Sequence, residues 1–216
     1  MVDTIIRGDS LEVMRKMKDK SIDLAFTDPP YGKKADKGTN GFGQAKNRKY
    51  KDDWDSFTPG LEYFTEILRV SKKAIIFGGN YFTPFLPVSN CWLVWDKKGD
   101  VPFNNPFADC ELIWTNFNKP IKKYTFKQQG FIKDTKDIRV HPTQKPTELI
   151  EMILRDFSNE GDIILDPFLG SGTTAVACVR LDRHCVGVEL SEEHYNTSCE
   201  RVEQERAVKE SQPELM

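Results

Sequence analysis

A carboxylate next to two prolines and an aromatic ring, Asp28-Pro29-Pro30-Tyr31, directly follows an apolar run at residues 22–26. The run predicts a buried strand, so the motif stands at a strand's carboxyl end, where open α/β sheets place their ligands. Two successive prolines have no backbone N–H and hold the chain extended, which leaves their carbonyl groups free. A carboxylate and a rigid carbonyl can accept both hydrogens of an amino group, and a tyrosine can stack on the flat ring that carries it. The motif therefore predicts recognition of an aromatic amine; a proline-rich turn capped by an aspartate is the purely structural alternative.

A glycine-rich turn forms the second candidate site. Residues 163–165 are apolar and predict a central parallel strand, and residues 166–174, with the sequence DPFLGSGTT, lead from it into a helix. Residues 170–175 fit the loose pattern of a dinucleotide-binding loop, and Glu189 stands about 20 residues on, where a carboxylate binds ribose hydroxyls. Asp166 at the strand end would repel a pyrophosphate and attract a sulfonium or ammonium group. The turn therefore favours S-adenosylmethionine over NAD as the adenosine-containing cofactor.

A third motif at residues 141–146, with the sequence HPTQKP, completes a set of three. Together they resemble the bacterial and phage DNA methyltransferases that modify amino groups, and their order resembles that of the circularly permuted beta group. The resemblance covers nearly the whole chain, from Ile6 to about Tyr195. It implies a Rossmann-like α/β methyltransferase fold, with a seven-stranded, mostly parallel sheet, one reversed strand and helices on both faces. The N-terminal strand at residues 4–8 would lie at the edge, beside the strand that ends in Glu189.

The resemblance also implies roles for single residues. The implied catalytic residues are Asp28, Pro29, Pro30 and Tyr31, and the implied cofactor-binding residues are Asp9, Gln144, Lys145, Pro146, Asp166, Phe168, Gly170, Gly172, Thr173 and Glu189. Asp9 would lie near the adenine ring, and the segment 144–146 would close over the methionine carboxylate. The implied reaction moves a methyl group from S-adenosylmethionine to the N6 amino group of adenine in DNA. The base must first flip out of the duplex, and Tyr31 is the residue expected to stack on it.

Other functions remain open at this stage. Cytosine N4 is the main rival target, since the same geometry activates its amine; this family tends to carry serine in place of Asp28 in such enzymes, so Asp28 favours adenine. An NAD-dependent oxidoreductase would account for the glycine-rich turn but would leave the Asp-Pro-Pro-Tyr motif without a purpose. A catalytically silent DNA-binding module is a third possibility, which the intact Asp28 disfavours.

The net charge of −2 conceals a segregation of charge along the chain. Residues 33–51 and 119–145 are rich in lysine and arginine, whereas the segment after Ser191 is acidic. Such segregation predicts one face that meets a polyanion, and two solvated loops are the alternative. The residues expected to contact double-stranded DNA are Lys33, Lys34, Lys46, Arg48, Lys49, Lys122 and Lys123. By analogy with related enzymes, a homodimer and a cognate restriction endonuclease are further candidate partners.

A chain of 216 residues with 38% hydrophobic and 30% charged residues predicts one globular catalytic domain over residues 1–216. A basic loop at 33–53 and a short target-recognition insertion at about 116–140 would extend from it. No apolar run approaches the roughly 20 residues of a membrane span, and the N-terminus lacks a signal-peptide pattern, so we expect a cytoplasmic protein associated with the nucleoid. Five cysteines without a C-x-x-C pair predict neither a disulfide framework nor a metal site.

Hydrophobic periodicity places most other elements. Strands are expected at residues 4–8, 22–26, 74–77, 91–95, 110–114, 163–165 and 185–188, and helices after Asp9-Ser10, from Thr58-Pro59, after Pro146, at 175–181 and at 192–209. Residues 116–140 are expected to be irregular. The tryptophans of the strands at 91–95 and 110–114 are expected in the core.

Overall fold

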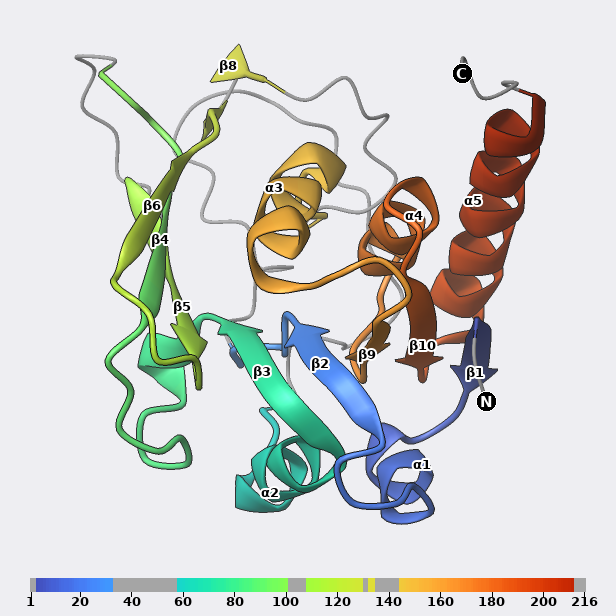
Figure 1. Cartoon of the computed structure of the whole chain (residues 1–216), viewed down its shortest axis with the longest axis horizontal. Helices are drawn as coiled ribbons and strands as arrows, with labels where there is room; N and C mark the ends of the chain where they lie inside the picture. The colour runs from blue at the N-terminus through green and yellow to red at the C-terminus, as the bar shows by residue number, and fades with distance from the viewer. Residues whose placement is uncertain (1–2, 33–57, 101–107, 130–131, 135–143, 212–216) are drawn as a thin grey trace.

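Strands alternating with helices build a layered α/β structure in the computed structural model of the chain, which describes residues 3–32, 58–100, 108–129, 132–134 and 144–211 (Figure 1). The main sheet contains β1 (Thr4–Arg7), β2 (Ile22–Thr27), β3 (Ser71–Phe77), β4 (Trp92–Asp96), β5 (Cys110–Thr115), β6 (Lys122–Thr125), β9 (Ile163–Asp166) and β10 (His184–Glu189). The short strands β7 (Gln128–Gln129) and β8 (Ile132–Lys133) pair separately. The helices are α1 (Ser10–Arg15), α2 (Leu61–Val70), α3 (Thr147–Phe157), α4 (Thr173–Arg180) and α5 (Glu192–Ser211), with a 3-10 turn, η1 (Gly79–Tyr81).

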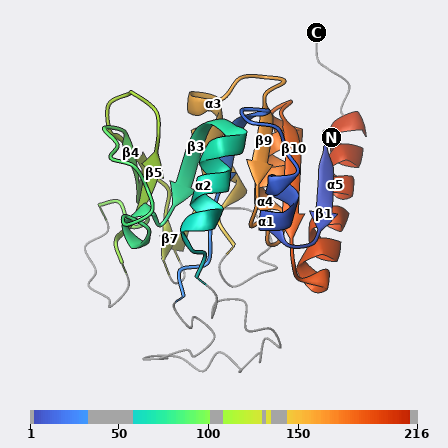
Figure 2. The same cartoon turned by 90° about the horizontal axis from the view of Figure 1, so that it is seen from below.

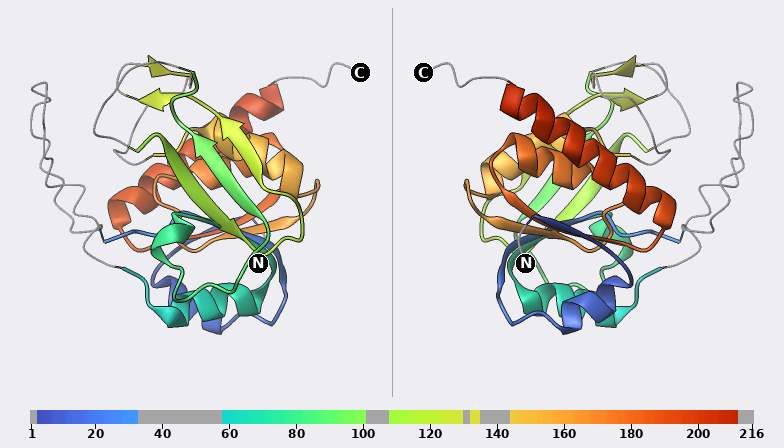
Figure 3. Two further views of the ribbon diagram at one scale, coloured as in Figure 1. Left: turned by 90° about the vertical axis from the view of Figure 1, so that its left-hand side faces the viewer. Right: turned by 90° about the vertical axis from the view of Figure 1, so that its right-hand side faces the viewer.

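Helices cover both faces of the sheet. α1 and α2 lie on one face and α3, α4 and α5 on the other (Figures 2 and 3). In α2, apolar side chains three or four positions apart, among them Phe64 and Ile67, are fully buried against the sheet. α2 begins at Leu61 with Gly60 as its N-cap, so Thr58-Pro59 precedes the helix instead of opening it.

The sheet order is β1-β10-β9-β2-β3-β5-β4-β6. β1, β10, β9, β2 and β3 are parallel, and β5 runs antiparallel to both β3 and β4. These pairings confirm the mostly parallel sheet with one reversed strand, and β1 lies at the edge beside β10 as predicted. Trp95 and Trp114 are buried in the core as predicted, whereas Trp92, in the same strand as Trp95, is only partly buried.

The expected count of seven strands is wrong: the described residues form an eight-stranded main sheet. The added strand is β6, which pairs in parallel with β4 through Leu93 and Lys122 and lies within the segment expected to be irregular. Of the four residues of β6 only Tyr124 is buried, because the strand forms the edge of the sheet. An edge strand with two lysines has no apolar alternation by which sequence could reveal it.

The arrangement of β9 and β2 fixes where a ligand can bind. The two strands pair in parallel, with Ala25 opposite Leu165. From β9 the chain passes through α4 to β10 on one side, and from β2 it passes through α2 to β3 on the other. Strand order thus reverses between β9 and β2, and open α/β sheets bind ligands in the crevice at the carboxyl ends of such strands. In the part of the chain that the structure describes, no helix has the length and apolar character needed to cross a lipid bilayer.

Candidate active site

Four acidic side chains stand at the carboxyl ends of four neighbouring strands. Glu189 and Asp166 are the last residues of β10 and β9, Asp28 directly follows β2, and Asp9 stands two residues after β1. In the sheet these strands are consecutive, in the order β1-β10-β9-β2. Neighbouring strands lie about 4.8 Å apart, so residues far apart in sequence form one acidic row along this edge. All four were predicted as site residues.

Asp166 lies at the centre of this row and is buried. Its Oδ1 accepts hydrogen bonds from the Thr27 hydroxyl at 2.8 Å and the Phe168 backbone N–H at 3.1 Å, and its Oδ2 accepts one from the Thr174 hydroxyl at 2.7 Å. Burial raises the pKa of Asp166 to about 6, although these three hydrogen bonds oppose the shift. Among the described residues no basic side chain forms an ion pair with it. The site therefore has an acidic centre that a cationic ligand would neutralise.

The glycine-rich turn is tied to Glu189. The Gly170 N–H donates to Glu189 Oε2 at 2.7 Å, and the Ser191 N–H donates to Oε1 at 2.8 Å. These two bonds fix the carboxylate, whose remaining lone pairs can still accept from hydroxyl groups. A side chain placed on Gly170 would meet no atom within 4 Å, so the turn faces open space there. Leu190, which directly follows Glu189 and which the sequence did not single out, is 71% exposed.

Asp9 is a member of the acidic row and also stabilises the start of α1. Its Oδ1 accepts from the backbone N–H groups of Leu11 at 2.8 Å and Glu12 at 3.1 Å, so Asp9 is the N-cap of α1. Its Oδ2 lies 3.4 Å from the hydroxyl of Tyr63, whose ring centroid is 5.7 Å from that of Phe168. Tyr63 thus joins two predicted cofactor residues. The sequence did not predict Tyr63 as a site residue, because a tyrosine within an amphipathic helix has no local feature that distinguishes it from a core residue.

The far side of the turn rests on α5. A Cβ on Gly172, whose φ is +86°, would come within 2.8 Å of the Ser198 Cβ. Arg201 donates to the Ser171 carbonyl at 2.6 Å and lies 3.4 Å from the Thr173 hydroxyl. Gly172 and Thr173 therefore make contacts that hold the turn against α5.

Both oxygens of Asp28 are engaged by side chains of the protein. The Tyr31 hydroxyl donates to Oδ1 and the Lys145 ammonium donates to Oδ2. The Tyr31 ring stacks on Tyr81 at 4.9 Å and fills the space above Gly78, at the end of β3. Burial and then the charge of Asp28 raise the pKa of Tyr31 well above its ordinary value, so the phenol stays protonated as a donor. Tyr81 is 42% exposed and presents the outer ring of this stack.

The segment 144–146 approaches Asp28 although it lies more than a hundred positions later in the chain. The resemblance implies that this segment closes over the methionine carboxylate of the cofactor. In the structure the Lys145 ammonium contacts Asp28 and lies 3.6 Å from Glu111 Oε2. The Gln144 carbonyl accepts from the Gln128 side chain at 3.3 Å, and Pro146 is buried as the N-cap of α3.

Comparison with known proteins identifies the family. The family described as DNA methylase, comprising N6 and N4 methyltransferases, matches residues 87–200, which are 114 of the 216 residues. This chain belongs to the DNA methylase family. It is 26% identical over 243 residues to the type II methyltransferase M.HpaI of Haemophilus parainfluenzae, covering 93% of this chain and 74% of that protein. It is 27% identical over 241 residues to the type II methyltransferase M2.DpnII of Streptococcus pneumoniae, covering 93% and 90%.

A solved structure supports the same fold. TTHA0409 of Thermus thermophilus matches this methylase with a TM-score of 0.62 and 22% identity, covering 94% of this chain and 96% of that one. TTHA0409 was also solved in complex with S-adenosyl-L-methionine. The likeness confirms the methyltransferase fold that the motifs implied.

The basic residues of the methylase divide into two groups. Lys122 pairs with Asp156 at 2.5 Å and Lys123 with Asp96 at 3.2 Å, and their side chains are 48% and 64% exposed. Both therefore have counter-ions within the protein. The other predicted DNA contacts, Lys33, Lys34, Lys46, Arg48 and Lys49, lie outside the described residues.

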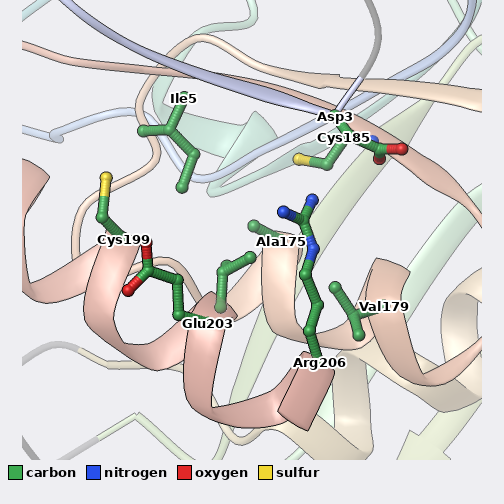
Figure 4. A pocket seen from close by; sticks show the side chains of 9 residues that line it. Asp3, Ile5, Ala175, Val179, Cys185, Cys199, Glu203 and Arg206 are labelled. Atoms are coloured by element: carbon green, nitrogen blue, oxygen red, sulfur yellow. The ribbon is translucent and has the colours of Figure 1, made fainter. Parts of the chain in front are cut away.

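A cavity of about 160 Å³ lies between β1, α4 and α5 of the methylase (Figure 4). Asp3 and Cys185, which help to line it, stand at the amino ends of β1 and β10. The cavity is therefore at the opposite end of these strands from the acidic row, and it contains none of the predicted site residues.

Proposed function

We propose that this DNA methylase transfers a methyl group from S-adenosylmethionine to the N6 amino group of an adenine that has flipped out of the DNA duplex. The observation that carries the proposal is the junction of β2 and β9. Asp28 directly follows β2, Asp166 ends β9, and these two strands pair in parallel, so both carboxylates stand at the same edge of the sheet. The Thr27 hydroxyl, next to Asp28 in the chain, donates to Asp166 Oδ1 at 2.8 Å. An acceptor pocket at Asp28 and a donor pocket at Asp166 would thus be direct neighbours.

The acidic row fits the chemistry of this cofactor. Glu189, already oriented by two backbone N–H groups, would accept hydrogen bonds from the ribose hydroxyls, and Asp9 and Tyr63 would border the adenine ring. Asp166 would neutralise the ammonium or sulfonium charge, and its buried carboxyl group would oppose the pyrophosphate of NAD. When bound, S-adenosylmethionine would supply a methyl group made electrophilic by the sulfonium.

The residues at Asp28 would activate the amino group. The lone pair of an exocyclic amine is delocalised into its ring, which makes the nitrogen a poor nucleophile. If Asp28 and the Pro29 carbonyl accept its two hydrogens, the nitrogen becomes pyramidal and its lone pair is free for in-line attack. No covalent intermediate with the enzyme is required. Tyr31 or the exposed outer ring, Tyr81, would supply the stacking surface that offsets the few kcal/mol of unstacking the base.

Several features of the surroundings belong to the same proposal. We propose a single catalytic domain over residues 1–216, with the basic loop at 33–53 and the insertion at about 116–140 contacting DNA phosphates and selecting the sequence. The enzyme would act in the cytoplasm on nucleoid DNA, with a homodimer and a cognate restriction endonuclease as further partners. Neutralising Lys46, Arg48 and Lys49 together should flatten the dependence of DNA affinity on salt, because fewer counter-ions would be released on binding. An unchanged slope would remove these residues from the interface.

The reaction is tested with purified protein, labelled S-adenosylmethionine and plasmid DNA from a methylation-deficient host. Digestion to nucleosides and mass spectrometry should find N6-methyladenine, and single-molecule sequencing should place it in a fixed context. Asp28→Ala should lower the rate at least tenfold to about a hundredfold while cofactor binding persists, because a charge-assisted hydrogen bond is lost. If N4-methylcytosine were the sole methylated nucleoside found, cytosine would replace adenine as the proposed target. Substantial turnover by Asp28→Ala would refute the role of this carboxylate.

A further inference from the structure

Four charged side chains of alternating sign form a continuous series that begins at Lys97, next to β4, and ends at Asp28. Lys97 follows β4 and donates to Glu111 Oε1, and Glu111 lies in β5. Glu111 Oε2 is 3.6 Å from the Lys145 Nζ, which in turn donates to Asp28 Oδ2. We call these four residues the charge chain. Its members come from four separate segments, and nothing in the family motifs includes Lys97 or Glu111.

The charge chain is largely withdrawn from water. The exposed fractions of the side chains are 18% for Lys97, 20% for Glu111, 11% for Lys145 and 28% for Asp28. Charges removed from water are costly unless they are paired, and alternating signs meet this condition along the whole chain. Burial alone would lower the pKa of Lys145, but Asp28 and Glu111 outweigh it and hold that pKa above its ordinary value. Burial likewise acts to raise the pKa of Glu111, yet Lys145 and then Lys97 hold it below its ordinary value.

The ammonium of Lys145 is also confined by its neighbours. It lies 5.8 Å from the ring centroid of Tyr31 and 5.4 Å from that of Phe77, over both rings. Glu111 Oε2 is buried without a hydrogen-bond donor among the described residues, so Lys145 is the cation placed to balance it. The lysine therefore has one defined position, between two carboxylates and two aromatic rings.

We propose that Lys145 and Glu111 are positioning residues for methyl transfer: Lys145 orients the carboxylate of Asp28 toward the incoming amino group, and Glu111 holds Lys145 in place. The inference rests on the proposed function of Asp28. With the Tyr31 hydroxyl on Oδ1 and the Lys145 ammonium on Oδ2, rotation of the carboxylate is blocked at both oxygens. Each oxygen keeps a further lone pair, so either can accept the one hydrogen that the amine would donate to Asp28. An acceptor fixed in advance needs no reorganisation as charge develops on the nitrogen.

This role differs measurably from that of a cofactor ligand. If Lys145 gripped the methionine carboxylate, its removal would weaken the binding of S-adenosylmethionine. If it orients Asp28, its removal lowers the rate of the transfer step and leaves cofactor affinity nearly unchanged.

The experiment compares Lys145→Met, Glu111→Gln and the double variant with the wild-type enzyme. Titration calorimetry gives the dissociation constant of S-adenosylmethionine, and single-turnover transfer of labelled methyl to unmethylated plasmid DNA gives the rate. We expect Lys145→Met to slow transfer about tenfold to a hundredfold, the range for a lost charge-assisted hydrogen bond, with a change of less than about threefold in the dissociation constant. Glu111→Gln should slow transfer by less, and the double variant should be no slower than Lys145→Met because Glu111 acts through the lysine. Lys145→Arg should restore part of the rate.

Two controls separate this role from general damage. Lys72 forms an ion pair of 2.6 Å with Asp23 near the amino ends of β3 and β2, away from the site at their carboxyl ends. Lys72→Met should therefore leave both the cofactor dissociation constant and the transfer rate unchanged. Glu111→Gln keeps the shape of the side chain, so it provides a rate even if Lys145→Met does not fold. Weaker cofactor binding with an unchanged rate would overturn the proposal, as would losses that multiply in the double variant. Failure of the proposed function would appear in the wild-type enzyme itself, as absent transfer, and is thus distinguishable.

Discussion

Replacing Asp166 by asparagine should change how the stability of the cofactor-free protein depends on pH. Burial raises the pKa of this carboxyl group from an ordinary 3.8 to about 6. Below 3.8 the group is protonated in both the folded and the unfolded chain, and it has no effect on stability. Between these values the folded chain holds the proton more tightly, so ionisation makes folding progressively less favourable as pH rises. Above about 6 the cost is complete, and at about 1.4 kcal/mol per pKa unit it amounts to about 3 kcal/mol.

The asparagine variant isolates this cost. Hydrogen bonds lost with the carboxylate shift the stability of Asp166→Asn by a constant amount, whereas the ionisation cost of the wild-type chain grows by about 1.4 kcal/mol between about pH 5 and about pH 7.5. Urea unfolding at both pH values should therefore show the variant gaining about 1.4 kcal/mol relative to wild type as pH rises. In parallel, the wild-type affinity for S-adenosylmethionine should fall below about pH 6 as Asp166 takes up a proton, and that of the variant should not. A stability difference independent of pH would refute the argument.

Three further predictions address Tyr31 and the packing of the glycine-rich turn. Tyr31→Phe removes a donor to the catalytic carboxylate and should slow transfer about tenfold at unchanged cofactor affinity; equal rates in single-turnover assays would contradict the contact. Gly172→Ala combines a positive φ with a contact of 2.8 Å to Ser198 and should destabilise the fold by about 2 kcal/mol or more in thermal unfolding, whereas Gly161→Ala, with a positive φ but open space, should cost about 1 kcal/mol. If the two variants unfold alike, the packing of the turn on α5 is not the cause. Arg201→Met should weaken cofactor binding several-fold in calorimetry, since the turn loses its support, and an unchanged affinity would speak against that support.

The sequence predicted the fold and most of the site because the signals are local. Buried parallel strands appear as short apolar runs, and the turns that follow β2 and β9 carry proline and glycine in patterns with a definite backbone meaning. These features predicted Asp28, Asp166 and Glu189 at the ends of strands, which is where they lie. The edge position of β1 followed from the resemblance, and the pairing of Ile5 with Gly187 confirms it.

What the sequence could not show depends on contacts between distant residues. Glu111 reads as one polar residue in a strand, and nothing near it in the chain reveals that Lys145 approaches from 34 positions away. The motif at residues 141–146 did not reveal that Lys145 contacts Asp28, because a motif states which residues recur and not which atoms they meet. Tyr63 likewise has no local sequence signal for its contact with Asp9, which is 54 positions away in the chain. The sequence also did not reveal that Lys122, a predicted DNA contact, has a counter-ion on α3.

The hydrogen bond between Thr27 and Asp166 has a consequence for how such enzymes diversify. The distance between the acceptor pocket at Asp28 and the donor pocket at Asp166 is set by the pairing of β2 with β9 and by the Thr27 hydroxyl. None of the atoms involved belongs to a surface loop. Segments that choose a DNA sequence can therefore be lengthened, shortened or exchanged while the path travelled by the methyl group keeps its length. Related enzymes can therefore change the DNA sequence that they recognise without changing the geometry of methyl transfer.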